Sequence, residues 1–543
     1  MKIFYFILAV FISVNTCFIY SQTIAGKVQD DLTKLPVQNA KVEIVYNATG
    51  FKDSVFTNSN GIWFYNLTTG NDNSEVITPN DFEVYQNYPN PFNPSTVIRF
   101  SVSEAKTVRL SVHNILGELI DSKEEFLNGG IYDVVWNSKG AAGVYLYTIS
   151  TDQNSLTKKM IQLDGGNGNG FGELKNISSS VNKNLGKELS ENISLIYSKK
   201  THFADTATYT VGGGENFLIF LKSIHSALRL TDLHNDILEV MVNDPTYHLN
   251  IFHDYNHTDI PRLQTGSVDV QFFSVWVSPT EFTDYFHQAQ EMLKIFNYEL
   301  SQNQNKIQQA FTSQQTNQIN ASGKIAAVIG VEGGHHIENS LENIDSLYND
   351  GMRYMTITWN NSTDWAISAQ DNRSATQGLS DFGNQVIKKL DSLGVIIDVS
   401  HVGIKTIQDI LLVTKNPIVA THSGARAIRN HYRNLYDWQI QDIAKSGGVI
   451  GIVFYPPFLT SSSTANVENV IAHIEYIKNL VGIDYVAVGS DFDGIGTNVV
   501  KGLEDVSMFG NLTNALIERG YSIEDIEKIL SKNFERVFEK VCK

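Results

Sequence analysis

Six side chains that could bind metal ions or transfer protons follow short apolar runs in the last three-fifths of the chain. Each run is rich in β-branched residues, which is typical of a buried parallel strand. The six are His234 and Asp236 in LRLTDLHND, Glu332 in IAAVIGVEGG, His401 in GVIIDVSH, His422 in PIVATHSG and Asp491 in YVAVGSDFDG. A barrel of such strands collects its C-terminal ends in one mouth, so these residues can meet there. Imidazoles and carboxylates at one mouth indicate a site for two divalent cations, and hence a metallohydrolase.

The first two motifs differ in what they can contribute to such a site. His234 and Asp236 are alternate residues of an extended strand, so both can face the mouth and bind one cation. Alone, such a pair is equally typical of a simple hydrogen bond. Glu332 has two oxygens and can bridge two cations, and an unpaired buried carboxylate would be costly. The alternative role for Glu332 is a helix cap or an ion pair.

The remaining three residues complete the chemistry. A lone histidine is usually structural, but His401 and His422 end neighbouring strands of the expected barrel, which favours metal binding by neutral imidazoles. A carboxylate such as Asp491 can take a proton from an attacking water and pass it to a leaving amine. Asp493, two residues later, is the competing candidate and has the pattern of a loop or cap residue.

An alternation of strands and helices from residue 226 onward must position these residues. Amphipathic stretches at 282–296, 382–394 and 467–482 carry apolar residues at helical spacing. The strand candidates are 228–234, 268–277, 325–332, 354–359, 394–401, 417–423, 449–455 and 485–491. Eight strands in this order predict an α/β fold with a (β/α)8 TIM-like barrel at 225–543. An open doubly wound sheet is the alternative.

The composition limits the remaining possibilities. With 543 residues the chain is too long for one core, and its net charge of −17 argues against nucleic acid and anionic membranes as partners. Residues 1–21 have the pattern of a signal peptide, and no later stretch is apolar enough to span a membrane. The residues before Cys17 match a lipobox poorly, which disfavours lipidation of this cysteine. After removal of the signal, Cys542 is the remaining cysteine, either an unpaired thiol on a frayed end or an intermolecular bridge.

Two all-β modules are expected before the barrel, and each resembles a known family. Residues 22–70, with PVQNAKVEIV and TNSNGIWFY, resemble a carboxypeptidase regulatory-like β-sandwich. Residues 75–164, with NYPNPFNPST before an F-S-V strand, resemble the FlgD-like, Ig-type sorting domain of type IX secretion. Such a domain normally ends a chain, whereas here it is internal, so a spacer or adhesion element is an alternative. Residues 165–224 are expected to hold a linker and returning strands, which we expect to complete the first sandwich.

The barrel itself resembles the membrane (renal-type) dipeptidase family, peptidase family M19. The resemblance rests on LHND, GVEGGH, GMRYMTIT, IIDVSHVG, THSGARAI, HYRNL and GSDFDG, in this order, and covers residues 228–538. It implies a binuclear zinc barrel that hydrolyses dipeptides, including those with a C-terminal D-residue. It further implies that His234 and Asp236 bind one zinc, His401 and His422 bind the other, and Glu332 bridges them. Asp491 would be the catalytic acid/base, and Arg433 would hold the substrate carboxylate.

One position departs from the family pattern. Trp359 follows the MTIT strand where the mammalian-type motif has a histidine that contacts substrate, so we expect an altered substrate preference. His335 and His336 are expected in a loop near the metals, where one could partly replace that contact. Two alternatives to dipeptide hydrolysis stay open. One is a related amidase for N-acyl amino acids or lactams, and the other is an inactive surface-binding or adhesion protein.

The sequence also gives expectations about location and assembly. The signal predicts export to the periplasm, the cell surface or the medium. A homodimer and attachment to the cell surface through the β modules are further expectations.

Overall fold

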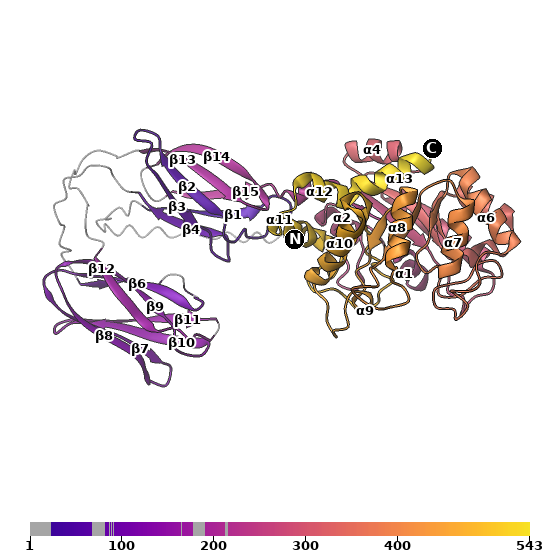
Figure 1. Ribbon diagram of the computed structural model, residues 1–543. Helices are drawn as coiled ribbons and strands as arrows, with labels where there is room; N and C mark the ends of the chain where they lie inside the picture. Colours follow the sequence, from indigo (N-terminus) through magenta and orange to yellow (C-terminus); the bar gives the residue numbers. More distant parts are fainter. Residues whose placement is uncertain are drawn as a thin grey trace, which may run out of the picture. The chain divides into compact units, whose positions relative to one another are not determined.

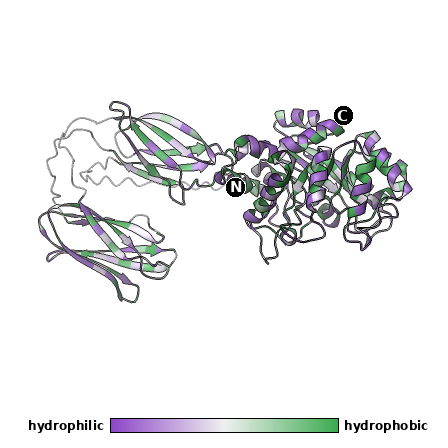
Figure 2. Ribbon diagram, in the orientation of Figure 1, coloured by the Kyte–Doolittle hydropathy of each residue, from purple (hydrophilic) through white to green (hydrophobic). Residues whose placement is uncertain are grey.

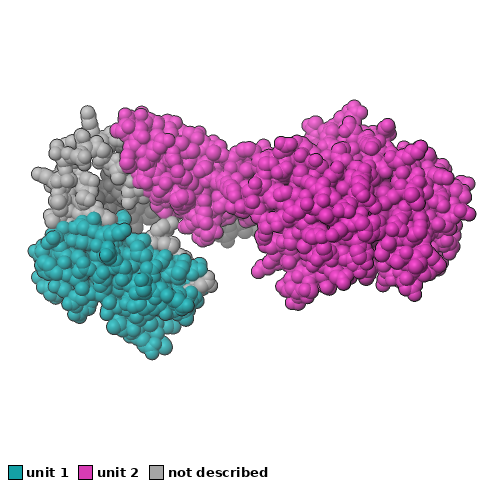
Figure 3. Space-filling model, in the orientation of Figure 1, with its two compact units in different colours: residues 1–22, 66–190 teal, residues 23–65, 191–543 magenta. Residues whose placement is uncertain are grey.

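The computed structural model describes residues 23–67, 82–85, 87, 90, 92–163, 165–176, 191–211 and 215–543. The expected signal peptide, including Cys17, lies outside these residues. The described chain divides into two compact units (Figure 3): residues 66–190 form one, and residues 23–65 with 191–543 form the other. None of the described helices is long and apolar enough to cross a membrane.

A sandwich of two sheets precedes the barrel in the larger unit (Figure 1). Its strands, in the orders β15–β1–β4 and β14–β13–β2–β3, are β1 (Thr23–Asp30), β2 (Lys41–Tyr46), β3 (Lys52–Phe56), β4 (Ile62–Asn66), β13 (Glu191–Lys199), β14 (His202–Val211) and β15 (Asn216–Leu221). Every second residue of β2 is buried, as expected of a strand with one face on a core. Because β15 pairs with β1 and β13 with β2, the strands after residue 190 belong to the sheets begun before residue 67.

The smaller unit is a second sandwich, inserted between β4 and β13. Its sheets have the orders β11–β10–β7–β8 and β12–β9–β6–β5. The strands are β5 (Glu83–Val84), β6 (Ser95–Val102), β7 (Lys106–Asn114), β8 (Leu119–Leu127), β9 (Gly130–Asn137), β10 (Gly143–Ser150), β11 (Ser155–Gln162) and β12 (Gly170–Asn176). Hydrophobic and hydrophilic residues alternate along many of them, and the buried ones surround Trp136 and Tyr147 (Figure 2).

Strand β12 lies in the glycine- and asparagine-rich stretch after residue 164, for which the sequence predicts a linker. The structure instead pairs it with β9. The glycines just before it explain the difference, because a Cβ on Gly166 would lie 2.5 Å from the Ser138 carbonyl oxygen and one on Gly168 only 2.6 Å from the Asn137 backbone. Glycine here permits close contact between two backbones, so its abundance marks packing as well as flexibility.

The C-terminal part is a parallel eight-stranded barrel surrounded by helices, which confirms the predicted fold. In spatial order its strands are β16 (Thr231–Asp232), β17 (Val270–Val275), β19 (Ile325–Glu332), β20 (Met352–Thr356), β21 (Ile396–Asp398), β22 (Ile418–Ser423), β23 (Ile450–Ile452) and β24 (Val486–Val488). All residues of β17 and β19 are buried, as expected of strands covered on both faces. The amide of Leu233 donates to the Val488 carbonyl at 3.1 Å, which joins the last strand to the first. A short extra strand, β18 (Ile307–Gln309), pairs with β19.

The helices cover the outside of the barrel (Figure 1). They are α1 (Ile237–Asn243), α2 (Ile260–Thr265), α3 (Tyr285–Gln302), α4 (Ser313–Ala321), α5 (Leu341–Asn349), α6 (Asp381–Leu393), α7 (Ile404–Val413), α8 (Asp437–Ser446), α9 (Pro456–Leu459), α10 (Val467–Val481), α11 (Phe509–Glu518), α12 (Ile523–Glu527) and α13 (Asn533–Val541). In α6 the Ser380 side chain caps the first turn, and Gly394 ends the helix at a φ of 74°. Its Val386, Ile387 and Leu390 are buried, so the predicted apolar stripe is the face toward the barrel.

Cys542 is not on a frayed end. It is 4% exposed, and its thiol donates to the Arg353 carbonyl at 3.6 Å. The preceding helix α13 buries Val537, Phe538 and Val541 in the core, which fixes the residue that follows it. This burial removes the thiol from contact with solvent and disfavours an intermolecular bridge.

Candidate active site

The six candidate residues lie together at the C-terminal mouth of the barrel. His234 and Asp236 follow β16, Glu332 ends β19, His401 follows β21, His422 lies in β22 and Asp491 follows β24. The five predicted ligands are at most 7% exposed. The rule that strand ends converge therefore holds for every residue chosen from the sequence.

Backbone conformation helps to aim two of these side chains. His401 has a φ of 67° and Asp491 a φ of 64°, in the left-handed region that non-glycine residues rarely adopt. Such a conformation costs about 1–2 kcal/mol for each residue. Strain of this kind persists where the surrounding structure enforces it, which is common at functional sites.

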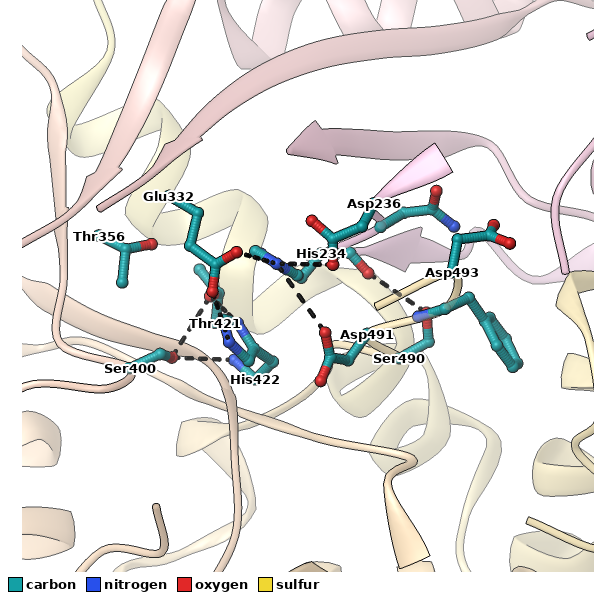
Figure 4. A network of polar contacts seen from close by, with 12 residues as sticks. His234, Asp236, Glu332, Thr356, Ser400, Thr421, His422, Ser490, Asp491 and Asp493 are labelled. Atoms are coloured by element: carbon teal, nitrogen blue, oxygen red, sulfur yellow. Dashed lines mark hydrogen bonds and ion pairs between the residues drawn. The ribbon is translucent and has the colours of Figure 1, made fainter. Parts of the chain in front are cut away.

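The two oxygens of Glu332 face two different groups of donor atoms (Figure 4). Oε1 lies 2.9 Å from His401 Nε2 and 3.4 Å from His422 Nε2. Oε2 lies 3.5 Å from His234 Nε2, which is itself 3.4 Å from Asp236 Oδ2. Within each group the donor atoms are no more than 4.8 Å apart. Each group has the donor types of a divalent cation site, and Glu332 belongs to both.

The electrostatics of the cluster also fit cations. Asp236, Glu332 and Asp491 face one buried space, and burial raises the pKa of Asp491 well above its usual value, with the Asp236 and Glu332 carboxylates adding to the effect. Burial raises the pKa of Asp236 as well. Among the described residues, the buried atoms His234 Nε2 and Asp236 Oδ1 have no hydrogen-bond partner. Divalent cations would bind these atoms and neutralise the carboxylates.

Each of the three histidines is oriented by a bond to its outer nitrogen. His234 Nδ1 lies 2.7 Å from the Tyr354 hydroxyl, His401 Nδ1 lies 3.0 Å from Asn360 Oδ1, and His422 Nδ1 lies 2.8 Å from Thr421 Oγ1. Asn360 Oδ1 can only accept a hydrogen bond, and the Thr421 hydroxyl donates to Asp398 and so can accept a hydrogen bond from His422. These bonds assign the proton of His401 and His422 to Nδ1 and leave Nε2 free to bind a metal.

Gly330 provides the space that Tyr354 occupies inside the barrel. A Cβ on Gly330 would lie 2.0 Å from the Tyr354 ring, so a side chain there is incompatible with this ring position. Tyr354 is fully buried, and its hydroxyl bonds to His234. The glycine in IAAVIGVE therefore supports the position of His234 indirectly.

Replacing Tyr354 with Phe is expected to weaken metal binding about 10- to 100-fold, because the His234 ring loses the bond that orients it. Metal retained after dialysis against graded chelator measures the effect. Tyr247→Phe is the matched control, since it removes a buried hydroxyl that bonds to the Thr258 carbonyl. Equal metal retention in the two variants would show that the Tyr354 hydroxyl does not orient His234.

Four of the six residues, Asp236, Glu332, His401 and Asp491, line a cavity of about 330 Å³. Arg433 and Trp359, both chosen from the sequence, line this cavity. Lining residues that the sequence analysis missed include Glu239, Trp276, Asn360 and Phe458. Trp276 follows β17 and Glu239 lies in the helix after β16, and neither residue type by itself indicates a site.

Arg433 presents unused donors to the cavity. Its side chain is buried, and its only hydrogen bond to the described residues runs from Nη2 to the His422 carbonyl at 3.4 Å. Nε and Nη1 are buried without a partner there. The guanidinium lies over the Phe458 ring, 5.3 Å from its centre. A buried cation with free donors in a fork is suited to a carboxylate ligand.

Trp359 and Trp276 form an aromatic wall of the cavity. Their ring centres are 5.0 Å apart with an interplanar angle of 55°, and Trp359 also approaches the ring of His401 at 6.2 Å. The wall offers apolar surface next to the cluster of candidate ligands.

Three further polar residues named from the sequence do not line the cavity. His335 Nε2 lies 3.0 Å from the Val277 carbonyl, and His336 Nδ1 lies 2.6 Å from the Gly333 carbonyl. Asp493 accepts from the His257 amide at 2.8 Å, as expected of a loop or cap residue. Neither histidine is therefore placed to contact a ligand in this cavity.

Comparisons with known proteins identify a family for the barrel and for the inserted module. A model of the membrane dipeptidase family, peptidase family M19, matches residues 219–543, and a model of a secretion system C-terminal sorting domain matches residues 86–162. Similar solved structures include the dipeptidase AC of family M19, 24% identical over 58% of this chain and 99% of its own, with a TM-score of 0.55.

Two further solved structures share the barrel fold. A Rhodobacter sphaeroides metallopeptidase, solved with a phosphinate mimic of L-Ala-D-Ala, is 24% identical over 58% of this chain and 99% of its own, with a TM-score of 0.54. The probable dipeptidase PvdM of Pseudomonas aeruginosa is 24% identical over 59% and 96%, with a TM-score of 0.53.

Proposed function

Because the chain belongs to the membrane dipeptidase family, peptidase family M19, we propose that its barrel hydrolyses dipeptides at a pair of zinc ions bridged by Glu332. The family makes the chain a dipeptidase-type, metal-dependent hydrolase. The observation that carries the detailed proposal is the placement of Glu332, whose two oxygens face separate groups of donor atoms.

In this proposal His234 and Asp236 bind one ion, and His401 and His422 bind the other. The mixture of imidazole and carboxylate donors is one that zinc prefers. Zinc ions bound there supply Lewis-acid polarisation of the scissile carbonyl and acidify the attacking water. The five proposed ligands are buried, and the lower dielectric there strengthens each of these electrostatic interactions.

Asp491 is proposed to move the proton. It lines the cavity, and its Oδ1 lies 4.0 Å from His234 Nε2, beside the metal cluster. Its amide donates to the His234 carbonyl at 3.1 Å, and the preceding Ser490 is held by Asp232. So positioned, the carboxylate takes a proton from the attacking water and delivers it to the departing amine.

Arg433 is proposed to bind the free carboxylate of the substrate, which places the peptide carbonyl over the cluster. The unused Nε and Nη1 donors support this role. The wall of Trp276 and Trp359 then bounds the space for the rest of the substrate, so Trp359 contributes to substrate preference.

The same wall supports a second candidate, an amidase for N-acyl amino acids or lactams, because two indoles could pack an acyl group. An inactive adhesion protein is disfavoured, because a site without catalysis would have no need of a complete, oriented ligand set.

Zinc-reconstituted protein is expected to cleave a panel of L-L and L-D dipeptides and to lose this activity in chelator. Amine release is the readout, and readdition of zinc should restore it. N-acetyl amino acids and a lactam belong in the same panel. Cleavage of these alone, without dipeptide cleavage, would favour the amidase. Bound zinc without cleavage of any substrate would contradict both proposals.

The β modules before the barrel indicate where the protein acts. The sorting-domain match supports export, and we propose that the protein acts in the periplasm, at the cell surface or in the medium. Attachment to the surface through the β modules and a homodimer are further proposals, the latter testable by sedimentation of the full chain.

A further inference from the structure

A second, smaller cavity of about 60 Å³ adjoins the main one and shares Glu239 and Trp276 with it. Its lining combines apolar side chains, among them Phe282 and Met292, with the carboxylates of Glu239, Glu281 and Glu291. No lysine or arginine of the described chain lines it. The smaller cavity is therefore apolar along its walls and acidic at its polar positions.

The smaller cavity lies across the barrel mouth from Arg433. Trp276 follows β17, the second strand, and Arg433 follows β22, the sixth. The second and sixth strands of an eight-stranded ring are four positions apart and hence on opposite sides. A dipeptide whose carboxylate is held by Arg433 and whose carbonyl lies over the metal cluster must direct its first residue toward this side.

Glu239 lies where the two cavities join and has no partner in the described structure. No hydrogen bond and no cationic side chain is among the interactions of its carboxylate. Its amide donates to the Asp236 carbonyl at 3.0 Å, which places it one helical turn beyond that proposed ligand. Because its side chain also lines the smaller cavity, the carboxylate can pair with a group at the end of a substrate side chain that reaches the junction of the two cavities.

We infer that Glu239 selects dipeptides whose first residue has a cationic side chain, lysine or arginine. The inference rests on the proposed dipeptidase function. The aliphatic stem of such a side chain packs against Trp276, which lines both cavities, and its charged end pairs with the Glu239 carboxylate at their junction. A neutral first residue leaves the Glu239 carboxylate without a partner, and the carboxylate repels an acidic first residue.

The test compares two dipeptides that differ in the terminal ammonium, L-lysyl-alanine and L-norleucyl-alanine. In the wild type the ratio of their kcat/KM values is expected to favour the lysyl substrate about tenfold or more, because a charged hydrogen bond is made with that substrate alone. Glu239→Gln should reduce the ratio to near one. The ratio within each protein cancels any loss common to both substrates, including partial misfolding.

Glu291→Gln is the matched control, since Glu291 lines the same cavity but is already paired with Lys294 at 2.6 Å. Its ratio should stay within about twofold of the wild-type ratio. A wild-type ratio near one, or an equal loss on both substrates in Glu239→Gln, would overturn the inference, the latter by assigning Glu239 to the α-amine. If wild-type protein cleaves neither substrate nor any other dipeptide, the failure lies with the proposed function instead.

Discussion

Replacing Asp491 with Asn should lower kcat about 10²- to 10⁴-fold while the protein retains its metal, because the amide cannot accept and return the proton. Asp491 also lies near enough to His234 and His422 to approach a cation there, but it belongs to neither of the two groups joined by Glu332, so its loss leaves both proposed ligand sets complete. Asparagine also tolerates the positive φ of 64° at this position, so the loop conformation should survive. Metal content and kcat, measured on the same preparation, separate catalysis from binding.

Asp493→Asn is the matched control for this substitution. Asp493 has a φ of 69° in the same loop, but its Oδ1 accepts from the His257 amide, a bond that asparagine can also accept. Its kcat should stay within a few-fold of the wild type, since it does not line the cavity. Near-normal turnover in Asp491→Asn, or an equal loss in both variants, would remove Asp491 from the proton-transfer role.

The barrel could be predicted from the sequence because its strands are buried on both faces. Runs such as IAAVIGVE are apolar throughout and end at a polar residue, so both the strand and its functional end are visible. The return of later strands to the first sandwich was also expected, but the sequence does not show which strands pair, because the pairing between β2 and β13 joins residues more than a hundred positions apart. Short strands carry no local signal that identifies so distant a partner.

For the candidate site, too, some features could be predicted from the sequence and others could not. The proposed ligands could be chosen from their types and strand-end positions, but the orientation of each imidazole depends on Tyr354, Asn360 and Thr421. These residues are ordinary members of strands and loops in the sequence. Glu239 and Trp276 likewise become informative only when the cavities that they line are known. Spacing along the chain predicts which residues converge, whereas cavities arise from side-chain packing that spacing does not encode.

Replacing Arg433 with Met should reduce kcat/KM for dipeptides about 10²-fold or more, in line with the roughly 2–5 kcal/mol for breaking a buried charged pair. The loss should disappear on dipeptide amides, which have no carboxylate for Arg433 to bind. Wild-type protein should therefore discriminate strongly between a dipeptide and its amide, and Arg433→Met only weakly, which isolates the pairwise interaction.

Arg426→Met provides the control for Arg433→Met, because Arg426 lies in the same loop region but stacks on Tyr436 and does not line the main cavity. It should preserve the wild-type discrimination between acid and amide. Were Arg433→Met to lose the same factor on dipeptides and on their amides, its guanidinium would act on a part of the substrate other than the carboxylate. In that case Nε and Nη1 of Arg433 would bind the scissile group or stabilise the fold. The proposed direction of the dipeptide across the barrel mouth, which depends on Arg433 binding the carboxylate, would then be unsupported.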